Sequence, residues 1–297
     1  MADLSIIIPS YNTCDLLLNC LASIYQTTNG DFEIIVVDNA SEDKTVAEVE
    51  KRYGQVKILK NLKNLGFAKA VNQGLRKAKG AYLLILNSDT LVSEKTIETE
   101  LSFLQNHQEV GVVGCQIRNL DGSLQPSGGF LPNLFNVFLW MSFLDNLDFL
   151  NQFLKPYHMD NLKFYTRQQD LGWVTGAFLL TTREMIEKVG YFDEKMFMYV
   201  EEVDWCARAS KFDRKIVFNP QAGVVHLKGS SARDDLAGIA EEFQEILYFF
   251  KKHKSLLQMP ILRFLLKSGA LVRYVLFGII AKDPEAKRIY AKAYKLA

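Results

Sequence analysis

Cysteine is scarce in this 297-residue sequence, and its four copies lack the paired spacing that binds zinc. Cys14, Cys20, Cys115 and Cys206 all lie in predicted strands or helices. We therefore expect reduced, mostly buried thiols, which suits a cytosolic protein. The sequence opens without a basic-then-apolar leader, and Asp3 follows almost at once, so no signal peptide is expected.

Glycine-rich phosphate loops are also missing. The sequence contains neither GxGxxG nor GxxxxGK[ST], which argues against a dinucleotide enzyme and against a P-loop ATPase. It has no GxSxG elbow and no Ser/His/Asp triad that would indicate a hydrolase. Repeats of about 20 to 50 residues are absent, as are low-complexity segments.

The charged residues are unevenly distributed. Residues 251–297 contain 11 Lys and Arg against 2 Asp and Glu, a net charge of +9, which leaves 24 against 32, a net of −8, for residues 1–250. The C-terminal region is therefore basic and the body acidic. The length and the 48% hydrophobic content suit one large globular domain with an appendage.

Apolar runs alternate with helical patterns along the first part of the chain. The runs that predict strands are 4–9, 32–38, 56–60, 81–87 and 111–117. The helical patterns are 15–27, 43–53, 68–79 and 93–106. This repeated βα pattern predicts an α/β fold in which helices cover both faces of a mostly parallel, Rossmann-like sheet.

The stretch 81–91, AYLLILNSDTL, is central to this pattern. Its apolar part ends abruptly in Asn87, Ser88 and Asp89. Ligands of parallel sheets bind outside the carboxyl ends of the strands, so Asp89 is predicted to face a site. The alternative is a turn or N-cap role, because a helical pattern begins near Ser93.

Other early strands also end in polar residues, and these ends should meet at one rim. The first strand leads into Pro9, Ser10, Tyr11 and Asn12. Asp38 ends the second strand and can bond a nucleobase or a ribose; its alternative is helix capping, for which Ser41 is the better candidate. The turn at 64–68 would bring helix-start amides close to a ligand, as phosphate sites do.

Seven motifs carry a family resemblance. They are IIIPSYN (6–12), IIVVDNASEDKT (34–45), NLGFAKAVNQG (64–74), LLILNSDT (83–90), GWVTGAFLLTTRE (172–184), FDEKMFMYVEEVDWCAR (192–208) and VVHLKGSS (224–231). In this order they resemble the family 2 inverting glycosyltransferases, and among them bacterial rhamnosyltransferase-like enzymes of surface polysaccharide assembly. The resemblance implies a glycosyltransferase A fold over residues 1–231. Its nucleotide-sugar half would be 1–118, its acceptor and catalytic half 119–231, and a helical region would follow at 232–297.

The resemblance also implies a nucleotide-sugar and a divalent cation at the strand ends. Positions that match the family's donor site are Pro9, Ser10, Tyr11, Asn12, Asp38, Asn64, Gly66, Phe67 and Asn72. Asn87, Ser88 and Asp89 stand where the family has Asp-x-Asp, which holds the cation on the diphosphate. Because only Asp89 brings a charge, Mg²⁺ or Mn²⁺ needs a further protein ligand, and His226 matches a family position for it. The alternative for His226 is a histidine of the core.

The acidic cluster Glu201, Glu202 and Asp204 is expected to open a helix that runs to about residue 210. The resemblance makes Glu202 the general base, with Glu201 as its substitute, since relatives have Glu-Asp where this chain has Glu-Glu.

The acceptor site is assigned from two of the seven motifs, those at 172–184 and 192–208. Its predicted residues are Trp173, Gly176, Asp204 and Trp205. Asp204 and Arg208 are spaced i, i+4 and can instead form a simple ion pair, and Trp205 is either a core residue or a platform for a sugar.

Two apolar stretches have open interpretations. Residues 130–154 are dense in Phe, Leu and Trp, which indicates core packing or, alternatively, an acceptor groove or membrane-touching lobe. Residues 261–281 are apolar but interrupted by Arg263, Lys267 and Arg273. The uncharged runs between these residues are too short to cross a bilayer. They suit a basic amphipathic helix on an anionic surface, or an ordinary helical subdomain or dimer contact.

Together, these patterns predict a metal-dependent glycosyltransferase. The best candidate for the donor is dTDP-rhamnose, with a UDP-sugar as an alternative, and the acceptor would be a saccharide or lipid-linked. Rival functions are a sugar nucleotidyltransferase, which would need a Gly-rich basic loop after the first strand, and a nucleotide-sugar-binding scaffold without activity. We expect no nucleic-acid partner and leave a homo-oligomer open. The expected location is the cytoplasm or the inner face of the cell membrane.

Overall fold

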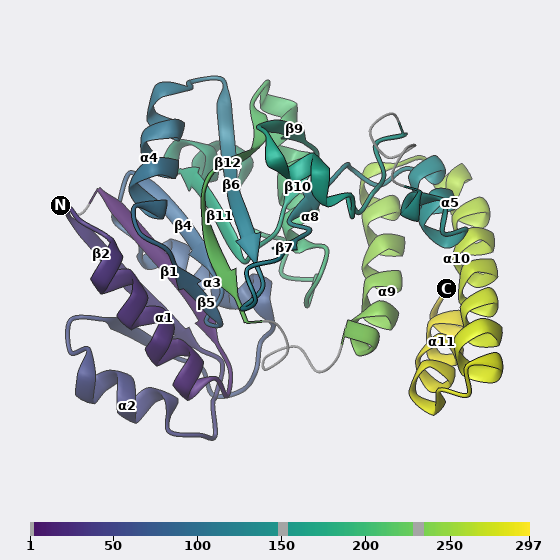
Figure 1. The fold of residues 1–297 in the computed structure, drawn as a ribbon, viewed down its shortest axis with the longest axis horizontal. Coiled ribbons are helices and arrows are strands. Elements are labelled where there is room, and N and C mark those ends of the chain that lie inside the picture. The colour runs from purple at the N-terminus through teal and green to yellow at the C-terminus, as the bar shows by residue number, and fades with distance from the viewer. Residues whose placement is uncertain (1–2, 148–153, 228–234) are drawn as a thin grey trace. The chain divides into compact units, whose positions relative to one another are not determined.

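The computed structural model describes residues 3–147, 154–227 and 235–297 (Figure 1). The chain divides into two compact units. Unit 1 comprises residues 1–128, 162–197 and 201–231, and unit 2 comprises residues 129–161, 198–200 and 232–297. The predicted boundary at 231/232 and the last part of the predicted stripe 130–154 lie outside the described residues.

Unit 1 is built on one large mixed sheet. In spatial order its strands are β3 (Lys57–Lys60), β2 (Phe32–Asp38), β1 (Leu4–Ser10), β4 (Tyr82–Leu86), β11 (Phe178–Thr182), β6 (Val110–Arg118), β12 (Lys215–His226) and β5 (Thr90–Val92). The short strand β7 (Leu124–Gln125) pairs with β6, and β9 (Gln169–Leu171) pairs with β12. Strands β1 to β4 run parallel, and β6 and β12 are parallel to each other. The predicted mostly parallel sheet is thus confirmed.

Helices connect and cover these strands (Figure 1). They are α1 (Cys14–Thr27), α2 (Thr45–Arg52), α3 (Phe67–Lys77), α4 (Thr96–Asn106), α7 (Arg183–Val189) and α8 (Glu201–Ala209), with the 3₁₀ turns η2 (Leu162–Thr166) and η3 (Ser210–Phe212). All seven residues of β1 are buried, because apolar side chains pack on both faces. Ile6 and Ile8 pack with Leu17 and Leu21 of α1, whereas Ile7 lies against Gly74 of α3.

Two strands depart from the regular βα series. β11 lies antiparallel between β4 and β6, so the fifth predicted strand does not neighbour the fourth. β5 occupies Thr90–Val92, where the sequence predicted only a loop before a helix, and that helix begins at Thr96. β5 pairs antiparallel with the end of β12. Neither pairing has a local sequence signal, because each joins segments far apart in the chain.

A bulge interrupts β12 between Asn219 and Gly223. Two hydrogen bonds join the bulge to helix α4: Asn219 Nδ2 donates to Glu100 Oε2 (3.0 Å), and Thr96 Oγ1 donates to the Gly223 carbonyl (2.7 Å). Glu100 is fully buried, and its other carboxyl oxygen has no hydrogen-bond partner in the described part of the chain. Burial raises the pKa of Glu100 to about 8, so this carboxyl stays protonated at neutral pH.

Unit 2 is helical. Its elements are α5 (Leu134–Met141), η1 (Leu144–Asn146), α9 (Asp235–His253), η4 (Leu256–Gln258), α10 (Met259–Arg273), the π-helical η5 (Tyr274–Ile280) and α11 (Pro284–Leu296). The C-terminal helical region is confirmed. Residues 129–161, which we had placed in the first domain, belong to this unit.

Buried polar contacts explain why residues 129–161 join the C-terminal helices. The Arg273 guanidinium donates to the carbonyls of Trp140 (2.6 Å) and Met141 (2.9 Å) and lies over the Phe143 ring at 4.0 Å. His158 pairs with Glu242 at 3.0 Å. The apolar residues Val137, Leu139 and Met141 are buried, as expected for a core stripe.

Glu100 gives the first testable prediction. Its pKa rises from 4.5 to about 8 on folding, so between these pH values the unfolded chain releases a proton that the folded protein keeps. Stability should therefore fall as pH rises through this window. Glu100→Gln copies the protonated carboxyl and should flatten the fall, with a gain at pH 8 of at most about 5 kcal/mol. Urea unfolding at several pH values measures this.

The control for Glu100 is Glu94→Gln, since Glu94 is exposed just before the same helix. This variant should retain the pH dependence of the wild type. A Glu100→Gln protein whose free energy of unfolding follows the wild-type pH profile would show that Glu100 is ionised in the folded state.

Candidate active site

The pairing of β5 with β12 brings Asp89 and His226 together. Thr90 lies opposite His226 in the ladder, and the amide of Leu227 donates to the Asp89 carbonyl (2.9 Å). This backbone frame sets His226 Nε2 3.2 Å from Asp89 Oδ1. Asp89 is buried, and the His226 side chain is 17% exposed, so one edge of the pair is open to solvent.

His226 has polar neighbours on both ring nitrogens. Asn87 Nδ2 lies 3.4 Å from Nε2, on the same side as Asp89. On the opposite side, Gln125 Oε1 lies 3.2 Å from Nδ1. The structure therefore brings together Asn87, Asp89 and His226, three residues that the sequence assigned to one site. Gln125 was not predicted.

A chain of buried hydroxyls links the ends of β1 and β4. Ser10 Oγ and Thr13 Oγ1 are 2.9 Å apart, and Thr13 Oγ1 donates to Ser88 Oγ (3.0 Å). All three residues are less than 5% exposed. Ser10 and Ser88 thus share one edge of the sheet, as predicted. Thr13 was not predicted, because a threonine just before a helix is more often its N-terminal cap.

The loops after β1 and β2 are tied to each other. Ser41 Oγ accepts from the Asn12 amide (2.9 Å), and Asn12 Oδ1 accepts from the Glu42 amide (2.8 Å). Asn12 therefore fixes the loop, and its φ of 53° is a left-handed conformation that asparagine tolerates well. Tyr11 stands beside it and is 38% exposed, so its ring is available at this rim.

The two carboxyl oxygens of Asp38 differ in their hydrogen bonding. Oδ2 accepts from the Ser41 amide (3.1 Å). Oδ1 is buried and has no hydrogen-bond partner among the residues described. Asp43, not Asp38 or Ser41, accepts from the Thr45 amide at the start of α2 (2.9 Å). A buried carboxylate oxygen without a donor costs free energy, which is expected where a ligand supplies the donor.

The turn at Asn64 differs from its predicted use. Asn64 Oδ1 accepts from the Gly66 amide (2.9 Å), and the Phe67 amide donates to the Phe197 carbonyl (3.0 Å). These two amides are therefore occupied within the protein and are not the anion-binding groups that we predicted. Gly66 is required here: its φ is 84°, and a Cβ would lie 2.7 Å from the Phe197 ring.

The predicted acceptor residues Trp173 and Gly176 lie in and just after the short strand β10 (Trp173–Val174), which pairs with β8 (Gly128–Gly129). A Cβ on Gly176 would lie 3.0 Å from the ring of Phe67. The two predicted residues Gly176 and Phe67 therefore do meet. Trp173 is partly exposed.

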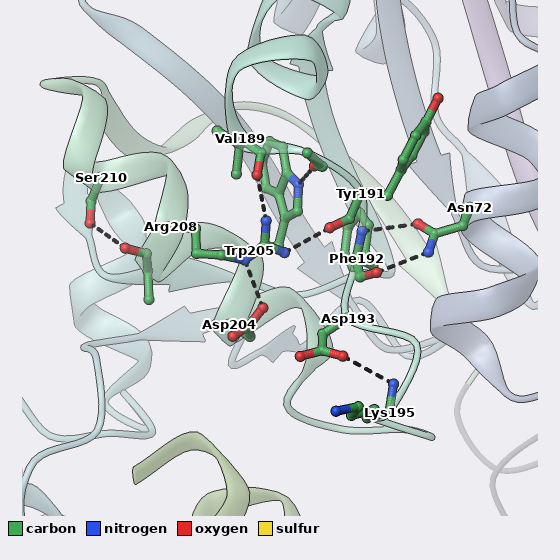
Figure 2. A network of polar contacts seen from close by, with 12 residues as sticks. Asn72, Val189, Tyr191, Phe192, Asp193, Lys195, Asp204, Trp205, Arg208 and Ser210 are labelled. Atoms are coloured by element: carbon green, nitrogen blue, oxygen red, sulfur yellow. Dashed lines mark hydrogen bonds and ion pairs between the residues drawn. The ribbon is translucent and has the colours of Figure 1, made fainter. Parts of the chain in front are cut away.

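Asp204 and Trp205 do not belong to an acceptor site (Figure 2). Both are fully buried in α8. Asp204 Oδ2 accepts from Arg208 Nε (2.9 Å), and the Trp205 indole donates to the Gly190 carbonyl (2.8 Å) and stacks on Phe192 with ring centroids 5.6 Å apart. The ion-pair and core alternatives are correct for these residues, since neither side chain reaches solvent.

The predicted role of Asn72 as a nucleotide-sugar contact also needs correction (Figure 2). It is fully buried in α3, where Oδ1 accepts from the Phe192 amide (2.9 Å) and Nδ2 donates to the Phe192 carbonyl (2.9 Å). A further bond joins Nδ2 to Glu194 Oε1 (3.1 Å). Its amide is consumed in holding the loop after α7, so Asn72 is not a nucleotide-sugar contact.

The two glutamates of the predicted catalytic pair occupy the first turn of α8. Glu201 is 3% exposed and Glu202 8% exposed. The predicted helix is confirmed, with its end at Ala209.

Comparison with known proteins identifies the family. Residues 5–190 match the family described as Glycosyl transferase family 2. The chain belongs to this family. The resemblance drawn from the seven motifs is thereby confirmed.

Relatives and solved structures agree with this family 2 glycosyltransferase assignment. An N-acetylglucosaminyl-diphospho-decaprenol L-rhamnosyltransferase of Mycobacterium tuberculosis is 28% identical over 283 residues, 91% of each chain. A Pyrobaculum calidifontis mannosyltransferase, PcManGT, solved with GDP-Man and Mn²⁺, has a TM-score of 0.60 at 18% identity over 98% of this chain and 79% of its own. S. aureus TarS 1–349 with UDP-GlcNAc has a TM-score of 0.58 at 17% identity over 99% and 90%. These structures share the fold.

Asp89 and His226 supply only two side-chain ligands, so a divalent cation at this pair would need further ligands from water or from a bound phosphate group. No group of three or more His, Cys, Asp or Glu side chains with metal-binding geometry occurs in residues 3–147, 154–227 and 235–297. Hard cations in phosphate chemistry, however, often take one or two protein ligands and fill the rest with water and phosphate oxygens. The two-residue set suits an ion that is shared with a diphosphate.

Proposed function

We propose that the protein is an inverting glycosyltransferase that binds a nucleoside diphosphate sugar and a divalent cation at the carboxyl ends of β1, β2 and β4. The observation that carries the proposal is the pair of Asp89 and His226, held 3.2 Å apart by strand pairing at this rim. Asp38 Oδ1, which is buried and has no hydrogen-bond partner among the described residues, lies at the end of β2 and supplies an acceptor for a donor nucleotide.

The side chains of this rim divide the work of binding. Asp38 Oδ1 accepts a hydrogen bond from the base or ribose, and Tyr11 covers the base. Asp89 and His226 hold the cation, which when bound offsets the charge that develops on the leaving diphosphate. The hydroxyl chain through Thr13 keeps the Ser88 loop rigid, so that the two ligands do not have to be ordered on binding.

Glu202 is the general base of the proposal. An inverting transfer needs one carboxylate that takes the proton of the acceptor hydroxyl as its oxygen attacks C1 of the sugar. Glu202 lies at the start of α8 and is nearly buried, which limits the water that competes with an acceptor. Glu201, in the same turn, is the alternative.

The donor and acceptor follow from the relatives. The M. tuberculosis relative is named for transfer of L-rhamnose to a diphospho-decaprenol acceptor, so we propose a rhamnosyl donor linked to dTDP and a lipid-linked acceptor in polysaccharide synthesis. The UDP-sugar bound by TarS keeps UDP as the alternative base. A lipid-linked acceptor suits action at the inner face of the cell membrane.

Unit 2 has a surface that suits such a membrane. Within the described residues no helix is long and apolar enough to span a bilayer. Large apolar side chains are nevertheless exposed along 256–280: Leu256, Leu257, Ile261, Phe264, Leu271, Val272, Val275, Leu276, Phe277, Ile279 and Ile280. Together with the net charge of +9 in 251–297, this lipid-facing segment (256–280) favours an anionic lipid surface.

Asp89→Asn tests the cation site. It should weaken binding of UDP or dTDP in the presence of Mn²⁺ by at least about tenfold, because the carboxylate of the proposed ligand pair is lost, yet leave metal-free nucleoside binding unchanged. Calorimetric titration measures both. Asp31→Asn, an exposed carboxylate before β2, is the control. Equal Mn²⁺-dependent affinities for wild type and Asp89→Asn would return Asp89 to a turn-forming role.

Glu202→Gln separates binding from chemistry. The amide cannot accept a proton, so turnover should fall by roughly 10² to 10⁴-fold while donor affinity is kept. Radiolabelled sugar transfer and calorimetry give the two readouts. A large loss in Glu201→Gln instead would identify Glu201 as the base. If both variants retain turnover, the base lies outside this turn.

The lipid-facing segment is tested by sedimentation with liposomes. We expect the protein to bind anionic liposomes at low salt and to be released by high salt, since each Lys or Arg contributes about 1 kcal/mol that salt screens. Phe264→Ser with Ile280→Ser should weaken binding by at least about tenfold, because two apolar side chains no longer enter the lipid. Both are more than 60% exposed, so the fold should survive.

The matched control for the lipid test is Leu62→Ser with Leu120→Ser. These leucines are 102% and 79% exposed in unit 1 and should not affect sedimentation. Point variants are preferred to truncation, because α10 and α11 pack within unit 2 against α5 and α9. A wild-type protein that ignores anionic liposomes at low salt would contradict the membrane proposal.

A further inference from the structure

Gln125 is a buried residue of β7 that none of the sequence motifs contains. It is 3% exposed. Its Nε2 donates to the carbonyl of His226 (2.8 Å), to Oδ1 of Asn119 (2.6 Å) and to the carbonyl of Arg118 (3.3 Å). Since Nε2 faces three acceptors, the amide has one favourable orientation, and the other end of the group must be the oxygen.

The oxygen of this fixed amide faces the ring of His226. Gln125 Oε1 lies 3.2 Å from Nδ1. An amide oxygen only accepts hydrogen bonds, so the contact is favourable when Nδ1 carries a proton. In a neutral imidazole the lone pair then lies on Nε2, the nitrogen that is 3.2 Å from Asp89 Oδ1.

A competing arrangement explains why the orientation matters. If Nε2 carried the only proton, that proton would lie on the side of Asp89 Oδ1, 3.2 Å away, and Nε2 would have no lone pair for a cation. Asn87 Nδ2 can only donate and lies 3.4 Å from the same Nε2 atom, so it favours the same tautomer, but it competes with a cation for the Nε2 lone pair. Among these neighbours, Gln125 is the group that acts on Nδ1.

We propose that Gln125 is a positioning residue that holds the proton of His226 on Nδ1 and so directs the Nε2 lone pair toward a divalent cation shared with Asp89. The inference rests on the proposed cation site and adds to it the group that selects the tautomer. Gln125 also bonds the His226 carbonyl, so one side chain fixes both the backbone and the ring of this ligand. Partners of this kind typically change metal affinity by about 10- to 100-fold when removed.

The test compares two substitutions that remove the same donor. Gln125→Met loses both Nε2 and the Oε1 acceptor, whereas Gln125→Glu loses the donor but keeps an acceptor for Nδ1–H. Mn²⁺ affinity in the presence of UDP, measured by calorimetry without acceptor, should fall about 10- to 100-fold in Gln125→Met. In Gln125→Glu it should stay within a few-fold of wild type. A residue that merely ties β7 to β12 would give equal losses in both variants.

Histidine NMR supplies a readout independent of affinity. With Mg²⁺ and UDP bound, the Nδ1–H signal of His226 should persist in the wild type and in Gln125→Glu and be lost or exchange-broadened in Gln125→Met. Gln169→Met is the matched control, because Gln169 bonds the Phe164 carbonyl (3.1 Å) in β9 and should leave affinity and signal unchanged. Thermal unfolding verifies that each variant is folded.

The outcomes separate this inference from the cation site itself. If Mn²⁺ binding does not depend on Asp89, the cation proposal fails whatever Gln125 does. If Asp89→Asn abolishes binding but Gln125→Met binds like wild type, only the role of Gln125 is overturned. Equal weakening in Gln125→Met and Gln125→Glu also overturns it, in favour of a structural tie.

Discussion

The antiparallel pairing of β5 with the end of β12 is the constraint on which the candidate site depends. It joins Thr90 to His226, residues from opposite halves of unit 1, and the Leu227 amide fixes the Asp89 backbone beside them. Because a shift of one residue turns every side chain of a strand to the other face, this register decides whether His226 meets Asp89 at all. The distance between Asp89 and His226 is thus set by backbone pairing.

The bulge in β12 precedes the segment that pairs with β5 and therefore affects the register of that pairing. Between Asn219 and Gly223 the strand leaves its ladder with β6, and α4 holds the displaced segment through Thr96 and Glu100. A buried carboxyl is costly unless it is protonated, and the raised pKa of Glu100 makes it so at neutral pH. The protein thus places a neutral acid in its core at the point where β12 is redirected toward the site.

The polar residues that the sequence assigned to the site fall into two groups that the sequence cannot separate. Asn12, Asn64 and Asn72 use their amides to fix loops, and Asp204 neutralises Arg208. Asp38 instead keeps a buried oxygen without a partner in the described residues. Since a side chain that is fully satisfied within the protein has no bond left for a ligand, this accounting favours Asp38 over Asn72 as a donor contact.

The basic charge of the C-terminal region is only partly available to a surface. Arg273 is buried against the carbonyls of α5, and Lys292 pairs with Glu241. A net charge counted from sequence therefore overstates the field of unit 2. The exposed apolar side chains of residues 256–280 are separate support for the proposed contact with lipid, because exposed apolar clusters are uncommon where no partner covers them.

The sequence by itself determined the class of fold, the positions of most strands and helices, and the placement of Asn87, Ser88 and Asp89 at a strand end, because apolar periodicity and chain breaks are local properties. Only the tertiary structure decided the insertion of β11, the pairing of β5 with β12 and the partner of His226. It also decided that Trp205 is core and that Asn72 holds a loop. The strand pairings and the contacts of His226 and Asn72 join residues about a hundred positions apart. The same Asn, Asp or Trp also has an identical sequence signature whether it faces a ligand or the interior.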